Sequence, residues 1–170
     1  MKEKMRTAAK RFIAPAADLS GIDAIMPDLR ASTLPQIMQA LAAQAGADVN
    51  LPEGYILDRL AAQEKQASSG IGNGVAIMHL RLSRLKHPYT VFARTVKPVA
   101  VSAVDSLPAD LFLLLLSPAG DVSGHLQRLS RFSRLLRDGE FRQKLRAVEG
   151  LDGLHALFML PEGQSPGILK

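Results

Sequence analysis

The feature that most constrains the fold is an unbroken apolar run from Leu111 to Leu116, which Pro108 precedes and Ser117-Pro118 follows. A run of this length is typical of a β-strand that is buried on both faces of a sheet. It is far too short to cross a bilayer, which requires about 20 apolar residues. A chain with such a strand must cover both faces of the sheet, and helices are the usual cover.

Helical periodicity on either side of this strand predicts the covering layers. Ser32 is an N-cap signal in front of Thr33-Leu34-Pro35, and apolar side chains then recur at helical spacing until Gly46. Further helices are predicted from about Pro52 to Ala67, from 123 to 137, from 140 to 148 and from 151 to 157. The helix 123–137 is expected to turn these side chains inward: Leu126, Leu129, Phe132, Leu135 and Leu136.

Shorter stretches are predicted to form the remaining strands. Residues 22–29 favour a short strand because Pro27 argues against a long helix, Val75 to Met78 follows a glycine-rich turn, and Tyr89 to Val96 lies between prolines. Together these elements indicate an α/β fold with a mixed central β-sheet flanked by helices. We expect a single domain over residues 18–160, between a basic, disordered tail at 1–17 and a flexible C-terminus at 161–170.

Composition and charge narrow the class of protein. A hydrophobic share of 47% with 22% charged residues is ordinary for a soluble globular protein, and the absence of cysteine excludes disulfides and thiolate zinc sites. The N-terminus lacks the apolar segment of a secretory signal, so a cytoplasmic protein without a membrane span is expected. Most of the net charge of +5 lies in the first 12 residues. The remaining basic stripe has no recognition motif or stacking aromatic beside it, so nucleic-acid binding is not expected. The stripe consists of Arg128, Arg131, Arg134 and Arg137.

A glycine-rich stretch with a histidine at the end of the following strand is the first candidate site. Ser68 and Ser69 precede Gly70-Ile-Gly-Asn-Gly74, the strand ends on His79, and Arg81 follows two positions later. Glycine-dense turns let backbone N–H groups approach an anion, and an imidazole there can act as a general base, a metal ligand or a phosphoryl acceptor. The stretch is neither a P-loop nor a dinucleotide fingerprint. A tight turn beside an inert histidine is the alternative.

His125 is the second candidate residue. It lies in the opening turn of the helix 123–137, where unpaired N–H groups favour anions, and Arg128 lies on the same side of that helix. A solvated polar face is the alternative. Two histidines without positioned carboxylates do not make a metal site, and no His-Glu-x-x-His spacing, nucleophile elbow or cysteine nucleophile is present.

The stretch from Ser68 to Arg81 resembles the signature Ser-Thr-Gly-Ile-Gly-Asn-Gly-Ile-Ala-Ile-Pro-His-x-Lys/Arg of the fructose/mannitol-type IIA domains of the bacterial phosphotransferase system. The similarity runs from about Ile22 to Val148, and the nearest branch is the free-standing, nitrogen-related one. The resemblance implies that His79 is the phosphorylated histidine and that His125 supports it in the pocket, with no cofactor. The phosphate-stabilising groups expected around them are Ser69, Gln63 and Arg81.

Two residues depart from the pattern of that family. Gln63 stands where the family usually has an arginine that helps to hold the phosphoryl group, and Met78 stands where it has proline. The resemblance implies a phosphocarrier that accepts a phosphoryl group on His79 from a histidine-phosphorylated carrier of the HPr/NPr type, and that acts mainly on regulatory target proteins. The alternative is a non-catalytic regulatory binding module that keeps the IIA fold with a weakened phosphorylation site.

Overall fold

The apolar run lies in β5 (Ala109–Pro118), the middle strand of a five-stranded sheet with the order β1-β4-β5-β3-β2. The structure is a computed structural model and describes residues 21–159, so the predicted tail 1–17 and C-terminus 161–170 lie outside the described residues. β5 pairs antiparallel with β4 (Tyr89–Val99) and parallel with β3 (Val75–Leu82). β1 (Ala24–Leu29) runs parallel to β4, and β2 (Gly70–Gly72) antiparallel to β3. The sheet is mixed, as predicted.

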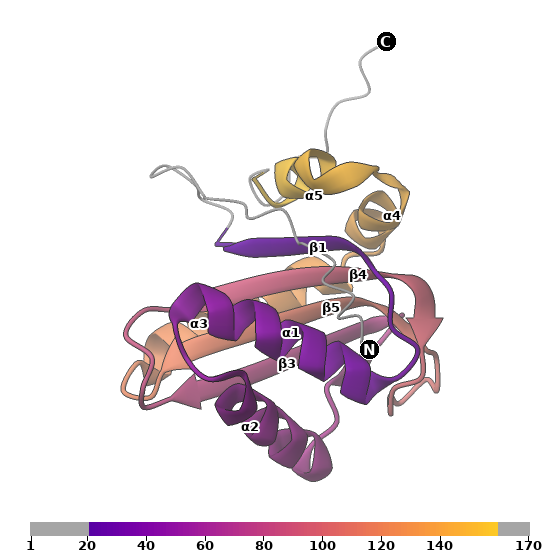
Figure 1. Cartoon of the computed structure of the whole chain (residues 1–170). Coiled ribbons are helices and arrows are strands. Elements are labelled where there is room, and N and C mark those ends of the chain that lie inside the picture. The colour runs from indigo at the N-terminus through magenta and orange to yellow at the C-terminus, as the bar shows by residue number, and fades with distance from the viewer. Residues whose placement is uncertain (1–20, 160–170) are drawn as a thin grey trace, which may run out of the picture.

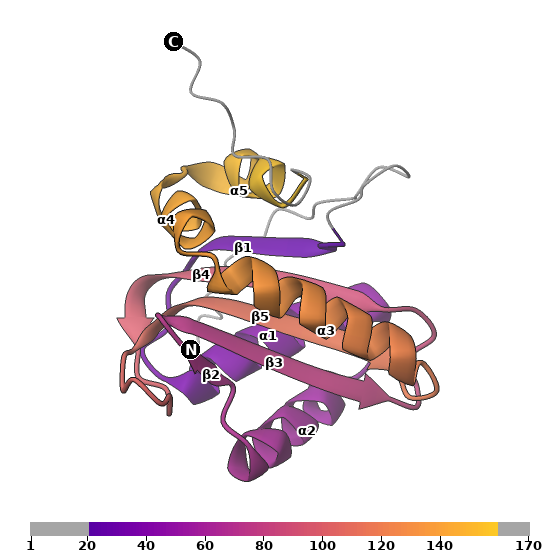
Figure 2. The same ribbon diagram turned by 180° about the vertical axis from the view of Figure 1, so that it is seen from behind.

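Helices cover both faces of this sheet. α1 (Leu34–Val49) and α2 (Glu53–Gln66) lie on one face (Figure 1). α3 (Val122–Arg137) crosses β5 and β3 on the other face (Figure 2). α4 (Gly139–Ala147) and α5 (Gly150–Met159) follow it, and α5 lies along the edge strand β1. Within residues 21–159, no helix is long and apolar enough to cross a bilayer.

Alternate side chains of β5 enter two apolar cores, as a strand buried on both faces requires. Phe112 and Leu114 pack with apolar side chains of α1 and α2. Leu111 and Leu113 belong to a second cluster that also contains Phe132 of α3 and buried side chains of α4 and α5. The prediction that this run forms a central, doubly covered strand is confirmed.

Two details of α1 differ from the prediction. The N-cap is Thr33 rather than Ser32, because the Oγ1 atom of Thr33 accepts a hydrogen bond from the backbone N–H of Gln36. Gly46 does not end the helix, which continues to Val49. A Cβ atom on Gly46 would lie 2.7 Å from the carbonyl oxygen of Leu51, so the glycine serves a close approach between backbone segments.

The region around His79 also differs from the prediction. β3 does not end at His79 but continues in parallel register with β5 as far as Leu82. The glycine-rich stretch is not an open loop, because Gly70–Gly72 pairs with β3 and forms a hairpin. The inward position expected for Leu126 is wrong as well, since this residue is 58% exposed.

Candidate functional site

The structure brings His79 and His125 into direct contact. Successive side chains of a strand alternate between its faces, so His79 shares a face with Ile77, which packs in the core cluster under α3. His125 lies in the first turns of α3 and is only 5% exposed. The Nδ1 atom of His79 lies 3.1 Å from the Nε2 atom of His125, within hydrogen-bond distance.

Three further polar side chains extend this contact into the protein. The Nδ1 atom of His125 lies 2.8 Å from the hydroxyl oxygen of Ser117, a fully buried residue near the end of β5. The same oxygen accepts a 2.9 Å hydrogen bond from Arg128 of α3. Arg128 also pairs with Asp121 at 2.7 Å, and Asp121 caps α3 by accepting from the N–H of Gly124. An unbroken chain of polar contacts therefore runs from His79 to the helix cap.

A small pocket of about 50 Å³ lies beside His79, between β3 and the C-terminal half of α2. Gln63, Glu64 and Ser69 line it together with His79. A carboxylate oxygen of Glu64 accepts the backbone N–H of Ser69 at 3.0 Å, which holds the segment after α2 against the helix. The hydroxyl of Ser69 is buried without a hydrogen-bond partner among the described residues. The pocket therefore has an unused hydroxyl donor, that of Ser69, among its lining residues.

The environment favours the neutral form of both imidazoles. Burial lowers the pKa of His79 below its ordinary value. The pKa of His125 is lowered by burial first, then by the neighbouring His79, Arg128 and Arg81, while Asp121 acts in the opposite direction. A neutral imidazole has one N–H donor and one lone-pair nitrogen. Each ring can therefore donate on one side and accept on the other.

The remaining predicted residues lie in different places. Ser69 and Gln63 share the pocket with His79, but Arg81 is exposed and donates to the carbonyl oxygen of Ala119 at 3.3 Å. Among the residues that the structure describes, no group of three or more His, Cys, Asp or Glu side chains is arranged to hold a metal ion.

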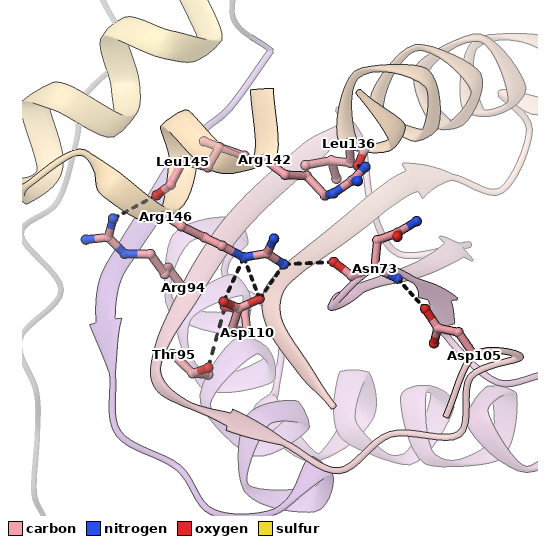
Figure 3. Close-up of polar contacts among 9 residues, drawn as sticks. All are labelled: Asn73, Arg94, Thr95, Asp105, Asp110, Leu136, Arg142, Leu145 and Arg146. Atoms are coloured by element: carbon pink, nitrogen blue, oxygen red, sulfur yellow. Dashed lines mark hydrogen bonds and ion pairs between the residues drawn. The ribbon is translucent and has the colours of Figure 1, made fainter. Parts of the chain in front are cut away.

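The glycine turn itself does not reach His79. Gly74 precedes His79 by five residues, about 16 Å at the usual rise along a strand. The N–H of Asn73 donates to Asp105, and its carbonyl accepts from Arg146, which also pairs with Asp110 (Figure 3). The backbone N–H of Asn73 is therefore engaged within the protein, and the turn lies away from His79.

Sequence reasoning gave Ser117 no role and assigned Arg128 to a solvated stripe. Ser117 contacts both His125 and Arg128 because the end of β5 lies beside the first turns of α3. The available signals were the serine that ends the apolar run and the three-residue spacing from His125 to Arg128.

The mixed sheet with helices on both faces agrees with the comparisons to known proteins. The family model described as "Phosphoenolpyruvate-dependent sugar phosphotransferase system, EIIA 2" matches residues 20–159, and the chain belongs to this family. Within it, the chain is similar to proteins named for nitrogen regulation. A nitrogen regulatory protein of Bradyrhizobium diazoefficiens is 36% identical over 147 residues, which cover 86% of this chain and 96% of that protein.

Further relatives have the same name. A nitrogen regulatory protein of Escherichia coli is 33% identical over 129 residues, covering 75% of this chain and 77% of that protein. The crystal structure of nitrogen regulatory protein IIA-Ntr from Neisseria meningitidis superimposes with a TM-score of 0.76 at 28% identity, covering 79% of this chain and 92% of that one. The fold and the family are therefore those expected from the sequence.

Proposed function

We propose that this chain is a cytoplasmic phosphocarrier that accepts a phosphoryl group on His79 from a histidine-phosphorylated protein of the HPr/NPr type. Its output is regulatory and operates through contacts with target proteins. The family supplies phosphotransferase components, and the relatives named above are nitrogen regulatory proteins. Both facts support a carrier with a regulatory role.

The contact between the two histidines is the observation that carries the proposal. It engages the Nδ1 atom of His79 and leaves Nε2 as the ring nitrogen without a partner among the described residues. Nε2 is therefore the atom that we assign to the phosphoryl group. His125 fixes the orientation of the ring, and in-line transfer between two imidazoles depends on such positioning.

The net reaction exchanges a proton for a phosphoryl group. The N–P bond of the donor phosphohistidine breaks as a bond from phosphorus to Nε2 of His79 forms, and the donor imidazole leaves with the electron pair. A proton passes from His79 to the donor ring, so both rings are neutral at the end. The hydroxyl of Ser69 and the side-chain amide of Gln63 line the adjacent pocket and supply neutral donors for phosphoryl oxygens.

The test is phosphorylation by phosphoenolpyruvate and the upstream carrier proteins, followed by mass spectrometry. The wild type is expected to gain one acid-labile phosphoryl group, and His79→Ala is expected to gain none. His87→Ala, which removes an exposed histidine, is the matched control and should be labelled like the wild type. A wild type that gains no mass under conditions that label another IIA protein would contradict the proposal.

Gln63 favours a second candidate function, a regulatory binding module that does not depend on phosphorylation. A neutral amide in this pocket offers a phosphoryl group a weaker contact than a guanidinium would. This candidate predicts that His79→Ala and the charge-mimicking His79→Asp bind a regulatory target with the affinity of the wild type. A large change in affinity with either variant rejects it.

A further inference from the structure

We propose that Ser117 and Arg128 are positioning residues that hold His125 in its Nε2–H tautomer and thereby lengthen the lifetime of phosphorylated His79. The tautomer can be tested without phosphorylation, and only the effect on lifetime rests on the proposed function. Neither residue reaches His79 directly. They act through His125, whose two ring nitrogens contact Ser117 on one side and His79 on the other.

The direction of the hydrogen bonds follows from Arg128, which can only donate. Its Nη2 group has two hydrogens, one for the hydroxyl oxygen of Ser117 at 2.9 Å and one for Asp121 at 2.7 Å. Since Asp121 also caps α3, the guanidinium is anchored to the start of the helix that carries His125. The oxygen of Ser117 therefore accepts a hydrogen bond from a fixed cation.

The hydrogen of the Ser117 hydroxyl then has one available acceptor. The residue is fully buried, and a buried hydroxyl hydrogen needs an acceptor. Among the described residues, the Nδ1 atom of His125 is the only acceptor in contact with this hydroxyl, at 2.8 Å. Ser117 therefore donates to Nδ1 of His125, and a neutral His125 has its proton on Nε2.

The position of the proton on His125 also determines which nitrogen of His79 accepts a hydrogen bond. With its proton on Nε2, His125 donates to the Nδ1 atom of His79 across the 3.1 Å contact. Nδ1 of His79 is then a lone-pair acceptor, and the other nitrogen holds either a proton or a phosphoryl group. Phosphorylation therefore replaces the proton on Nε2 without reversing any other hydrogen bond in the chain from Arg128 to His79.

This arrangement protects the N–P bond because loss of phosphate from a phosphohistidine is promoted by protonation of the other ring nitrogen. Here that nitrogen is occupied by the N–H of His125. The positive charges of Arg128 and Arg81 also protect the N–P bond. Both lower the pKa of His125, which disfavours a second proton on that ring and so a proton that could pass to His79. A long-lived phosphorylated state suits a protein whose output is regulatory.

The first measurement is the tautomer in the unphosphorylated protein, from the ¹⁵N chemical shifts of the imidazole nitrogens. We expect the proton of His125 on Nε2 in the wild type and in Ser117→Thr, which keeps the hydroxyl. Ser117→Ala is expected to populate the Nδ1–H tautomer as well. A proton on Nδ1 of His125 in the wild type would overturn the proposal.

The second measurement is the half-life of the phosphorylated protein at neutral pH. Ser117→Ala and Arg128→Met are expected to shorten it by about 3- to 10-fold, the effect of one lost hydrogen bond. Arg137→Met, which removes the same charge from the last turn of α3, should match the wild type. Equal half-lives in all four proteins would reject the effect on lifetime.

A failure of this proposal can be distinguished from misfolding of a variant and from a failure of the proposed function. If Ser117→Ala does not fold, the half-life of Arg128→Met still tests the effect on lifetime, and the tautomer of His125 in the wild type still tests the hydrogen-bond direction. If the wild type takes no phosphoryl group, the proposed function fails, whereas the tautomer of His125 still confirms or rejects the positioning role of Ser117.

Discussion

At the scale of single residues, Gln63 is expected to limit how strongly the pocket binds a phosphoryl group. It lines the pocket beside His79 with a neutral amide, and Glu64 in the same pocket is already engaged by the N–H of Ser69. We expect Gln63→Arg to raise the equilibrium constant for phosphoryl transfer from the donor protein by about 10-fold. A hydrogen bond from a charged donor to a phosphoryl oxygen contributes roughly 1.5–3 kcal/mol, more than a neutral one.

The equilibrium is measured by mixing the phosphorylated donor with each variant and separating the phosphorylated forms by mass. Gln63→Met, of similar length and without polar donors, is the control and should lower the phosphorylated fraction. An unchanged fraction in Gln63→Arg would mean that the guanidinium pairs with Glu64 instead of reaching the phosphoryl group.

At the scale of elements, the turn of the hairpin between β2 and β3 has left-handed backbone at Gly72, Asn73 and Gly74. Gly74 has a φ of +77°, and a Cβ there would lie 2.5 Å from Nη2 of Arg146 and 3.0 Å from Asp110. We expect Gly74→Ala to lower the free energy of unfolding by about 1–3 kcal/mol, through backbone strain and the displaced ion pair. Urea denaturation measures this loss.

Gly120→Ala is the matched control for the hairpin. A Cβ on Gly120 meets no atom within 4 Å, so this substitution should change the free energy of unfolding by less than about 0.5 kcal/mol. If both variants unfold at the same urea concentration, the left-handed conformation and the close approach of Arg146 contribute no measurable stability.

Elements were predictable where a local pattern determines them. The apolar run of β5 and the periodicity of α2 and α3 depend on neighbours in sequence, and these predictions agree with the structure except for the exposed Leu126. Gly46 was misleading because glycine is a common helix end, whereas here it allows the turn after α1 to approach the helix. The extension of β3 beyond His79 depends on register with β5, which a single segment does not encode.

Part of the candidate site could likewise be predicted from the sequence, and part could not. His79 and His125 are named by the sequence motif and the family resemblance, yet their 3.1 Å contact depends on α3 crossing β3. Ser117 was unpredictable as a partner of His125 because a strand end and a helix start meet only in the folded chain. Long-range contacts of this kind therefore have to come from the structure.

At the scale of the whole molecule, α5 stabilises a part of the core that lies far along the sheet from His79. α5 lies along β1, and β1 is three strands away from β3, about 14 Å at the usual strand spacing. In α5, Phe158 is 1% exposed and packs edge-on against Phe92 and Phe141. This region stabilises the chain without contacting His79.

Phe158→Ala is therefore expected to separate stability from phosphotransfer. Loss of a buried phenylalanine costs about 3–5 kcal/mol, so the melting temperature should fall by roughly 10 °C. Below its own melting transition the variant should accept a phosphoryl group at the rate of the wild type, because the contacts of His79 and His125 are intact. Met159→Ala, at the 37% exposed neighbour, is the control for thermal stability. A slower transfer by fully folded Phe158→Ala would mean that the loss of packing reaches the histidine pair through the core cluster that Phe158 shares with Phe132 and Ile77.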